Sequence, residues 1–200
     1  MNLGGMCRLA ARYSDRYDEY VKTTAQDGSE AFEGEALHWF EVFRDAINEA
    51  YFEISRSRLT PQCRLEVQLP ADRVIDLYQM QPEMCSICGV YRLDGMTEVG
   101  YVFINRTSIE VTGARGGDAV IVEYHYLPER LEAESDEPVF PESLADPSIY
   151  VALAVARVWQ SERKMSAAQY WLSEYYQKLR AIRTSLKSVR RRRLPRMMFR

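Results

Sequence analysis

The chain has 200 residues, of which 46% are hydrophobic and 28% are charged, so it can form one domain, or one domain with an appendage, around a substantial core. No apolar run approaches the ~20 residues that a membrane-spanning helix needs, and the first residues lack the apolar core of a signal peptide. These features argue against a helical membrane protein. We expect a chain that is made in a cytoplasm and either stays there or is packed into a particle.

The net charge of −3 hides an uneven distribution. Residues 180–200 contain nine basic residues and no acidic one, which leaves 17 basic against 29 acidic residues, a net of −12, in residues 1–179. A basic tail on an acidic body is typical of a tail that binds an anionic surface. The acidic body argues against a domain that lies on DNA over its whole length.

The cysteines predict neither a metal site nor redox chemistry. They are Cys7, Cys63, Cys85 and Cys88. Residues 85–88 form a single C-x-x-C, whereas a structural zinc site needs four ligands, and the two histidines, His38 and His125, are not at ligand spacing. The motif also lies in a β-rich run and not at the strand-to-helix turn of a thioredoxin-type site. We expect reduced thiols and no metal or other cofactor.

Two helices are predicted in residues 1–60. Apolar residues recur every three or four positions from Leu3 to Tyr20, as on one helix face, although part of residues 15–33 could instead be an ordered loop. A broader stripe from Ala36 to Ile54 predicts a core-facing helix that runs to about residue 58 and ends before Pro61. His38 lies beside this stripe, where a surface or half-buried position without function is expected.

Period-two alternation follows in residues 61–127. Strands are predicted at 63–69, 74–80, 85–93, 99–104, 108–112 and 119–126, with a two-residue hairpin turn at Asp94-Gly95. Residues 113–118 (Gly-Ala-Arg-Gly-Gly-Asp) read as a turn, because a phosphate-binding loop needs a Lys-Ser/Thr and opens a helix. The expected result is an antiparallel meander. Its aromatic residues suit either subunit contacts or the core: Tyr91, Tyr101, Phe103, Tyr124 and Tyr126.

Residues 128–146 are rich in proline and acid, which predicts a stiff, extended connector. Its acidic residues, Glu132, Glu134, Asp136 and Glu137, are expected to be solvated. Asp146 and Pro147 should cap and open the next helix. Apolar stripes then predict C-terminal helices over residues 147–188, which are either broken at 162–164 or continuous.

The predicted fold class is therefore α+β: a helical bundle, with two N-terminal and one or two long C-terminal helices, an inserted antiparallel β-sheet domain and an extended basic tail at 189–200. The tail has apolar residues after a basic run, a composition typical of a segment that orders on binding. Its candidate contact residues are Arg190, Arg191, Arg192, Arg193, Arg196, Met197, Met198, Phe199 and Arg200.

Several short motifs carry a resemblance to a known family. A strand that ends in Tyr124-His-Tyr-Leu-Pro128 is followed by an acidic stretch, and Asp136-Glu-Pro-Val-Phe-Pro-Glu142 then leads into a helix of small residues. Upstream, the Leu69-Pro-Ala-Asp72 corner precedes Val74-Ile-Asp76. Over roughly residues 3–182, this order of elements resembles the adaptor, or head-completion, proteins of tailed bacteriophages.

The resemblance implies a structural protein of the virion neck. Such a protein would form a homo-oligomeric ring of twelve copies on the portal protein and present its other face to tail or nozzle proteins around the DNA channel. The basic tail would dock on the portal or make non-specific contact with channel DNA. No catalytic spacing is found, so an enzyme is not expected. The alternative is a nucleic-acid-binding accessory protein that acts through the arginine tail.

Overall fold

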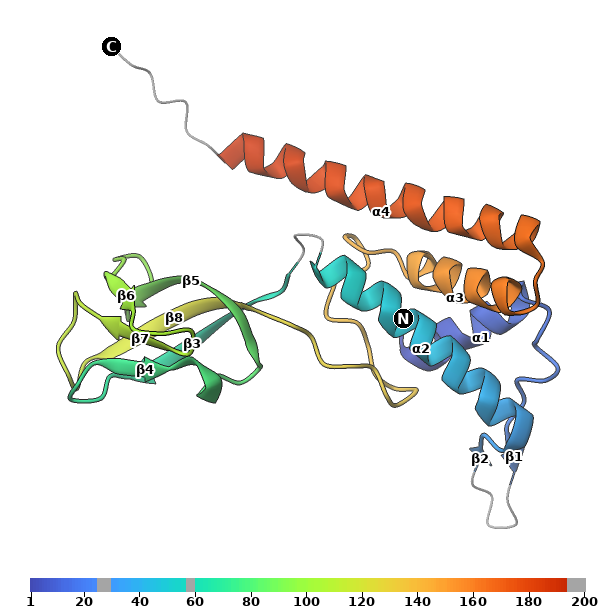
Figure 1. The fold of residues 1–200 in the computed structure, drawn as a ribbon, viewed down its shortest axis with the longest axis horizontal. Coiled ribbons are helices and arrows are strands. Elements are labelled where there is room, and N and C mark those ends of the chain that lie inside the picture. Colours follow the sequence, from blue (N-terminus) through green and yellow to red (C-terminus); the bar gives the residue numbers. More distant parts are fainter. Residues whose placement is uncertain (25–29, 57–59, 194–200) are drawn as a thin grey trace. The chain divides into compact units, whose positions relative to one another are not determined.

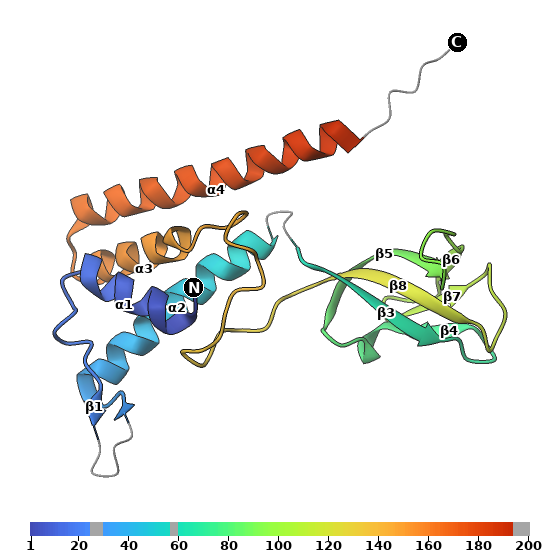
Figure 2. The same ribbon diagram turned by 180° about the vertical axis from the view of Figure 1, so that it is seen from behind.

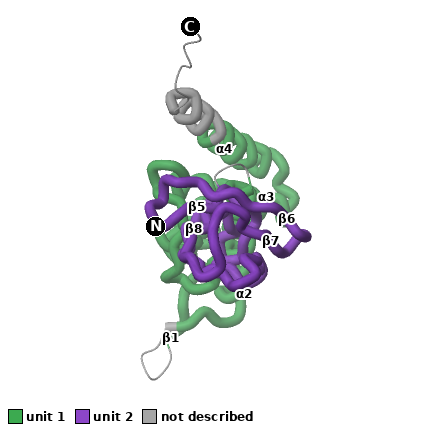
Figure 3. Tube along the Cα trace, turned by 90° about the vertical axis from the view of Figure 1, so that its left-hand side faces the viewer, with its two compact units in different colours: residues 1–58, 130–200 green, residues 59–129 purple. Residues whose placement is uncertain are grey.

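The computed structural model describes residues 1–24, 30–56 and 60–193, with side chains up to residue 182 except at Glu30. Within these ranges the protein is α+β, with four α-helices, two antiparallel three-stranded sheets and a two-residue ladder, β1–β2 (Thr23–Thr24 with Glu30–Ala31) (Figure 1). The chain divides into two compact units (Figure 3). The helical unit comprises residues 1–58 and 130–200, and the β unit comprises residues 59–129.

The helical unit contains α1 (Leu3–Tyr13), α2 (Gly34–Arg56), α3 (Ser148–Ser161) and α4 (Met165–Arg193). Helix α3 packs against each of the other three (Figures 1 and 2). Ten of its fourteen residues are buried, and its alanines allow this close approach from several sides. Large buried side chains of the other helices complete the core, among them Met6, Phe43, Ile47, Tyr51, Tyr175 and Leu179.

Helix α1 is shorter than its apolar spacing predicts. It ends at Tyr13, where the Ser14 hydroxyl donates to the Ala10 carbonyl at 2.8 Å and Asp15 adopts a positive φ of 56°. Tyr20 nevertheless reaches the core, with its ring 4.9 Å from that of Phe32. The helical extension to Tyr20 is therefore wrong, and the alternative of a loop in this region is correct.

The C-terminal helices are separate. The Asp146 carboxylate accepts the Ser148 N–H at 2.7 Å, and Pro147 already has helical dihedral angles, as expected for a cap and a first residue. Residues 162–164 interrupt the helix between α3 and α4, and Arg163 among them has a φ of 61°. Lys178 donates to Ser148 at 2.9 Å, so α4 runs about 22 Å past the start of α3 before it ends. Its backbone continues to Arg193, five residues beyond the predicted helix end at 188.

The β unit holds β3 (Gln62–Gln68), β4 (Val74–Asp76), β5 (Met84–Arg92), β6 (Tyr101–Phe103), β7 (Ser108–Val111) and β8 (Ala119–Tyr126). The strand orders are β3-β8-β5 and β4-β7-β6. The predicted meander is wrong, because β8 returns to lie between β3 and β5. Both sheets contribute to one buried cluster, which includes Leu69, Ile75, Val90, Ile109 and Val122.

One strand end and one turn of the β unit differ from their predictions. The strand expected at 74–80 ends at Asp76, whose carboxylate accepts the Tyr78 N–H at 3.0 Å and opens a 3-10 helix, η1 (Leu77–Gln79). The turn at Asp94-Gly95 is wider than two residues, since the Arg92 N–H donates to the Thr97 carbonyl at 2.9 Å.

Candidate interaction surfaces

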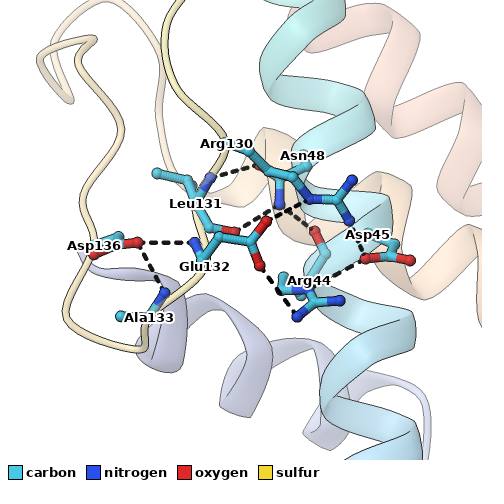
Figure 4. A network of polar contacts seen from close by, with 8 residues as sticks. All are labelled: Arg44, Asp45, Asn48, Arg130, Leu131, Glu132, Ala133 and Asp136. Carbon is cyan, nitrogen blue, oxygen red and sulfur yellow. Dashed lines mark hydrogen bonds and ion pairs between the residues drawn. The ribbon is translucent and has the colours of Figure 1, made fainter.

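The chain leaves the β unit through a segment that is fixed to the helical unit by a buried asparagine. Asn48 on α2 is 2% exposed, and its amide nitrogen donates to the Leu131 carbonyl at 2.9 Å. Its amide oxygen accepts the Leu131 N–H, also at 2.9 Å. One side chain thus satisfies both backbone groups of a buried residue, as Figure 4 shows. Leu131 lies outside any helix or strand, so the Asn48 side chain supplies the hydrogen bonds that a helix would otherwise give to these backbone groups.

Of the four acidic residues of this segment, Glu132 and Glu137 are exposed, as expected for a solvated run, and Glu134 and Asp136 are half-buried; Glu132 and Glu134 also form ion pairs. Glu132 pairs with Arg44 at 3.2 Å and with Arg130 at 3.0 Å, and Arg130 also pairs with Asp45 (Figure 4). Separately, Glu134 pairs with Lys22 at 2.5 Å. The connector is therefore bonded to α2 and to the segment around Lys22 as well as containing several prolines.

Asp136 closes a local turn in the same segment. Its carboxylate accepts the N–H groups of Glu132 and Ala133, both at 2.8 Å, and these bonds lower the Asp136 pKa below its ordinary value. Its carbonyl accepts the Leu3 N–H at 2.8 Å, and the Glu134 carbonyl accepts the Gly4 N–H at 2.9 Å. The connector therefore satisfies N–H groups in the first turn of α1, which have no partner inside the helix.

The helical unit exposes Tyr13, Tyr17 and Tyr170, and we call these residues, together with the half-buried Trp171 and with Arg12, the aromatic surface. The Tyr13 ring lies 5.4 Å from Trp171, and the Arg12 guanidinium lies 4.9 Å from the Tyr17 ring. Tyr13 is 50% exposed and Tyr170 is 61% exposed. Tyrosine, tryptophan and arginine are the residue types that dominate the binding energy of protein interfaces.

The β unit exposes apolar residues from the end of β5 to the residue after β6. They are Leu93, Met96, Val102, Phe103 and Ile104. Of the aromatic residues predicted for contacts or core, Tyr124 belongs to the core and donates to the Gln81 carbonyl at 3.0 Å, whereas Phe103 is exposed. Tyr91, Tyr101 and Tyr126 are half-buried.

The described residues include no group of three or more His, Cys, Asp or Glu side chains that could hold a metal ion. All four cysteines fall within these ranges and none forms a disulfide; burial raises the Cys7 pKa to about 12. Cys85 and Cys88 lie on β5, and His38 is exposed on α2. Residues 113–118 form a turn between β7 and β8, in which the Arg115 N–H donates to Asp118 at 2.9 Å.

An open cavity of about 310 Å³ lies beside the start of α3 in the helical unit. Pro138, Phe140, Pro147 and Tyr150 line it, and Glu142 at its edge pairs with the Met1 amino group at 2.6 Å. The lining includes neither histidine nor cysteine. Over the part of the chain that the structure describes, no helix is both long and apolar enough to cross a membrane.

The structure describes only part of the predicted docking residues. The backbone of residues 190–193 belongs to α4, but the side chains of Arg190, Arg191, Arg192 and Arg193 lie outside the described residues. Arg196, Met197, Met198, Phe199 and Arg200 lie outside them entirely. Sequence reasoning missed Asn48 as the anchor of the connector. The signal was present, since Asn48 is a polar residue between Ile47 and Tyr51 in an apolar stripe.

A search of protein-family models and a search of curated proteins each found no match to this chain.

Proposed function

We propose that this protein is a structural adaptor of a tailed-phage neck, which assembles as a ring on the portal protein and connects the head to tail or nozzle proteins. The proposal starts from the resemblance of the Leu69–Asp72 corner and the segment 124–142 to the adaptor family. The observation that supports it best is the insertion of one compact unit, residues 59–129, into the chain of another. Two units suit a ring protein, because one could pack against its copies while the other meets a different partner.

The pair of hydrogen bonds between Asn48 and Leu131 fits this role. It holds the chain that returns from the β unit against α2, which favours a fixed attachment of the connector to the helical unit. The aromatic surface is the candidate contact between neighbouring copies, whose helical units would pack side by side around the DNA channel. The net charge of −12 on residues 1–179 suits a DNA channel, because a negative lining repels phosphate and lets DNA slide.

The basic tail would dock on the portal, by charge and by the apolar residues Met197, Met198 and Phe199. Deletion of residues 188–200 should abolish attachment to portal particles and leave the helical unit folded. Co-sedimentation with portal particles measures the attachment, and tryptophan fluorescence measures the fold. A truncated protein that still co-sediments as the full chain does would refute the docking role of the tail.

The backbone of α4 stays helical through Arg193, and this favours one second candidate. The four consecutive arginines at 190–193 then belong to a helix, and such a basic run could bind the phosphates of a nucleic acid as an accessory protein does. Gel shifts with duplex DNA at low and moderate salt separate the two functions. The adaptor proposal predicts weak binding that salt removes, whereas tight, sequence-dependent binding that persists in salt would support the accessory protein.

A further inference from the structure

The cavity beside the start of α3 has apolar walls. Pro138, Phe140, Pro147 and Tyr150 line it, and Val139 in the same lining is 50% exposed. Its volume of about 310 Å³ lies at the lower end of the range of ligand pockets, which is about 300–1,000 Å³. A cavity of this size and lining suits a few apolar side chains of an incoming chain.

The lining also includes a buried polar group without a partner. Tyr150 is 1% exposed, and its hydroxyl has no hydrogen-bond partner among the described residues. Burial raises the pKa of this phenol above its ordinary value, so the group stays a neutral donor. Most buried hydroxyls are bonded, and a ligand that carries an acceptor, such as a backbone carbonyl, would satisfy this one.

The edge of the cavity is acidic. Glu137 and Glu142 belong to its lining, and both are exposed. Glu142 pairs with the Met1 amino group at 2.6 Å, whereas Glu137 forms no ion pair within the part of the chain that the structure describes. An apolar cavity with a free carboxylate at its edge fits a segment in which apolar side chains stand next to cations.

Residues 194–200 of this chain (Leu-Pro-Arg-Met-Met-Phe-Arg) have that composition: three consecutive large apolar residues between two arginines, and no acid. We propose that the cavity binds this segment of a second copy of the chain. The apolar side chains of residues 197–199 would enter the cavity, and a carbonyl of the segment would accept from Tyr150. One arginine of the segment would lie beside Glu137, as its charge requires.

The length of α4 favours a second copy over the same chain as the source of the segment. Lys178 on α4 is bonded to Ser148 at the start of α3, and α4 continues from there for 15 residues (193 − 178), about 22 Å, to Arg193. A fully extended chain spans at most about 3.6 Å per residue, so Met197 lies within about 14 Å of Arg193 and Met198 within about 18 Å. Both residues of the same copy therefore fall short of the cavity.

A tail of one copy in the cavity of the next is a head-to-tail contact, because the two surfaces that meet are different. Such contacts either close into a ring or continue as a filament. The inference rests on the proposed function for the closed ring, but the contact itself needs no portal. Where a portal is present, it would compete with the cavity for the same tail residues.

The first test uses a fluorescent peptide of residues 194–200 as the probe and fluorescence anisotropy as the readout. The peptide should bind the protein that lacks residues 194–200, and a peptide with serine at 197–199 should not. Glu137→Lys in this truncated protein should weaken binding by about three- to tenfold, because an attraction becomes a repulsion. Glu41→Lys is the matched control: it makes the same change at an exposed residue outside the cavity lining, and it should leave the affinity within about twofold.

Sedimentation equilibrium of the full chain gives the second readout. Its mean mass should rise with concentration, and that of the truncated protein should not. A mixture of the truncated protein with full-length Glu137→Lys should associate, because the first supplies an intact cavity and the second supplies the tail.

Three results would overturn the inference: a peptide that does not bind the truncated protein, equal effects of Glu137→Lys and Glu41→Lys, or a truncated protein that associates as the full chain does. A full chain that excludes the peptide and stays a monomer would also overturn it, since its own tail would then occupy the cavity. Neither measurement contains a portal, so failure of the adaptor proposal and failure of this inference are distinguishable.

Discussion

Replacement of Asn48 by alanine should destabilise the helical unit far more than removal of any charged group beside it. In Asn48→Ala the N–H and C=O of Leu131 lose both partners while Leu131 stays buried, at 4% exposure. Each buried group left unpaired costs about 1–3 kcal/mol, so the free energy of unfolding should fall by about 2–6 kcal/mol. The neighbouring ion pairs cannot compensate, because none of them contacts the Leu131 backbone.

Arg130→Ala is the matched control from the same network. It removes two ion pairs of residues that are about half exposed, which should cost only about 0–1 kcal/mol. All three tryptophans, Trp39, Trp159 and Trp171, belong to the helical unit, so their fluorescence during urea unfolding reports on that unit. The Leu131 amide should also exchange faster in Asn48→Ala. A loss below about 1 kcal/mol for Asn48→Ala, or an equal loss for both variants, would refute the reasoning.

Two further predictions concern the β unit. Gly116→Ala should destabilise the β unit by about 1–3 kcal/mol in chemical unfolding, because a Cβ would lie 2.8 Å from the Ala71 backbone. Gly100→Ala is the control and should cost less, because its Cβ would meet only the Thr112 hydroxyl. Equal losses of stability in the two variants would contradict this prediction. Thr97→Val should raise the Asp94 pKa, which its bonds from Thr97 and Met96 lower to about 2. Because the folded pKa is depressed, the Asp94 contribution to stability is present above its ordinary pKa and disappears as the pH falls toward 2. Carboxyl NMR titration measures both pKa values, and an unchanged value in Thr97→Val would show that the hydroxyl has no part.

Local signals in the sequence predicted much of the secondary structure. The apolar stripe of α2 and the Asp146-Pro147 start of α3 each depend on residues within a turn or two of one another, whereas the sequence left the break at 162–164 as one of two alternatives. The predicted extension of the first helix to Tyr20 was wrong, because the helical spacing of Tyr17 and Tyr20 continues past Ser14 and Asp15. There the Ser14 side-chain bond and the positive φ of Asp15 end the helix. Tyr20 is buried by packing from distant residues, which periodicity alone cannot distinguish from a helix face.

Non-local contacts were beyond the reach of pattern reasoning. Strand β8 pairs with β3, which lies more than fifty residues earlier, and nothing within either strand specifies that pairing over a meander. The partners of the acidic connector were missed for the same reason: Arg44, Asn48 and Lys22 come from the first quarter of the chain. Charge alone predicts solvated acids, and they are exposed or half-buried, but the tertiary fold also brings cations to Glu132 and Glu134.

The most direct test of the adaptor proposal is electron microscopy of the purified protein mixed with portal particles from the same phage. We expect a closed ring of identical copies, coaxial with the portal, in which the helical units contact one another. A protein that remains a monomer, neither forming a ring nor attaching to the portal, would contradict the proposal.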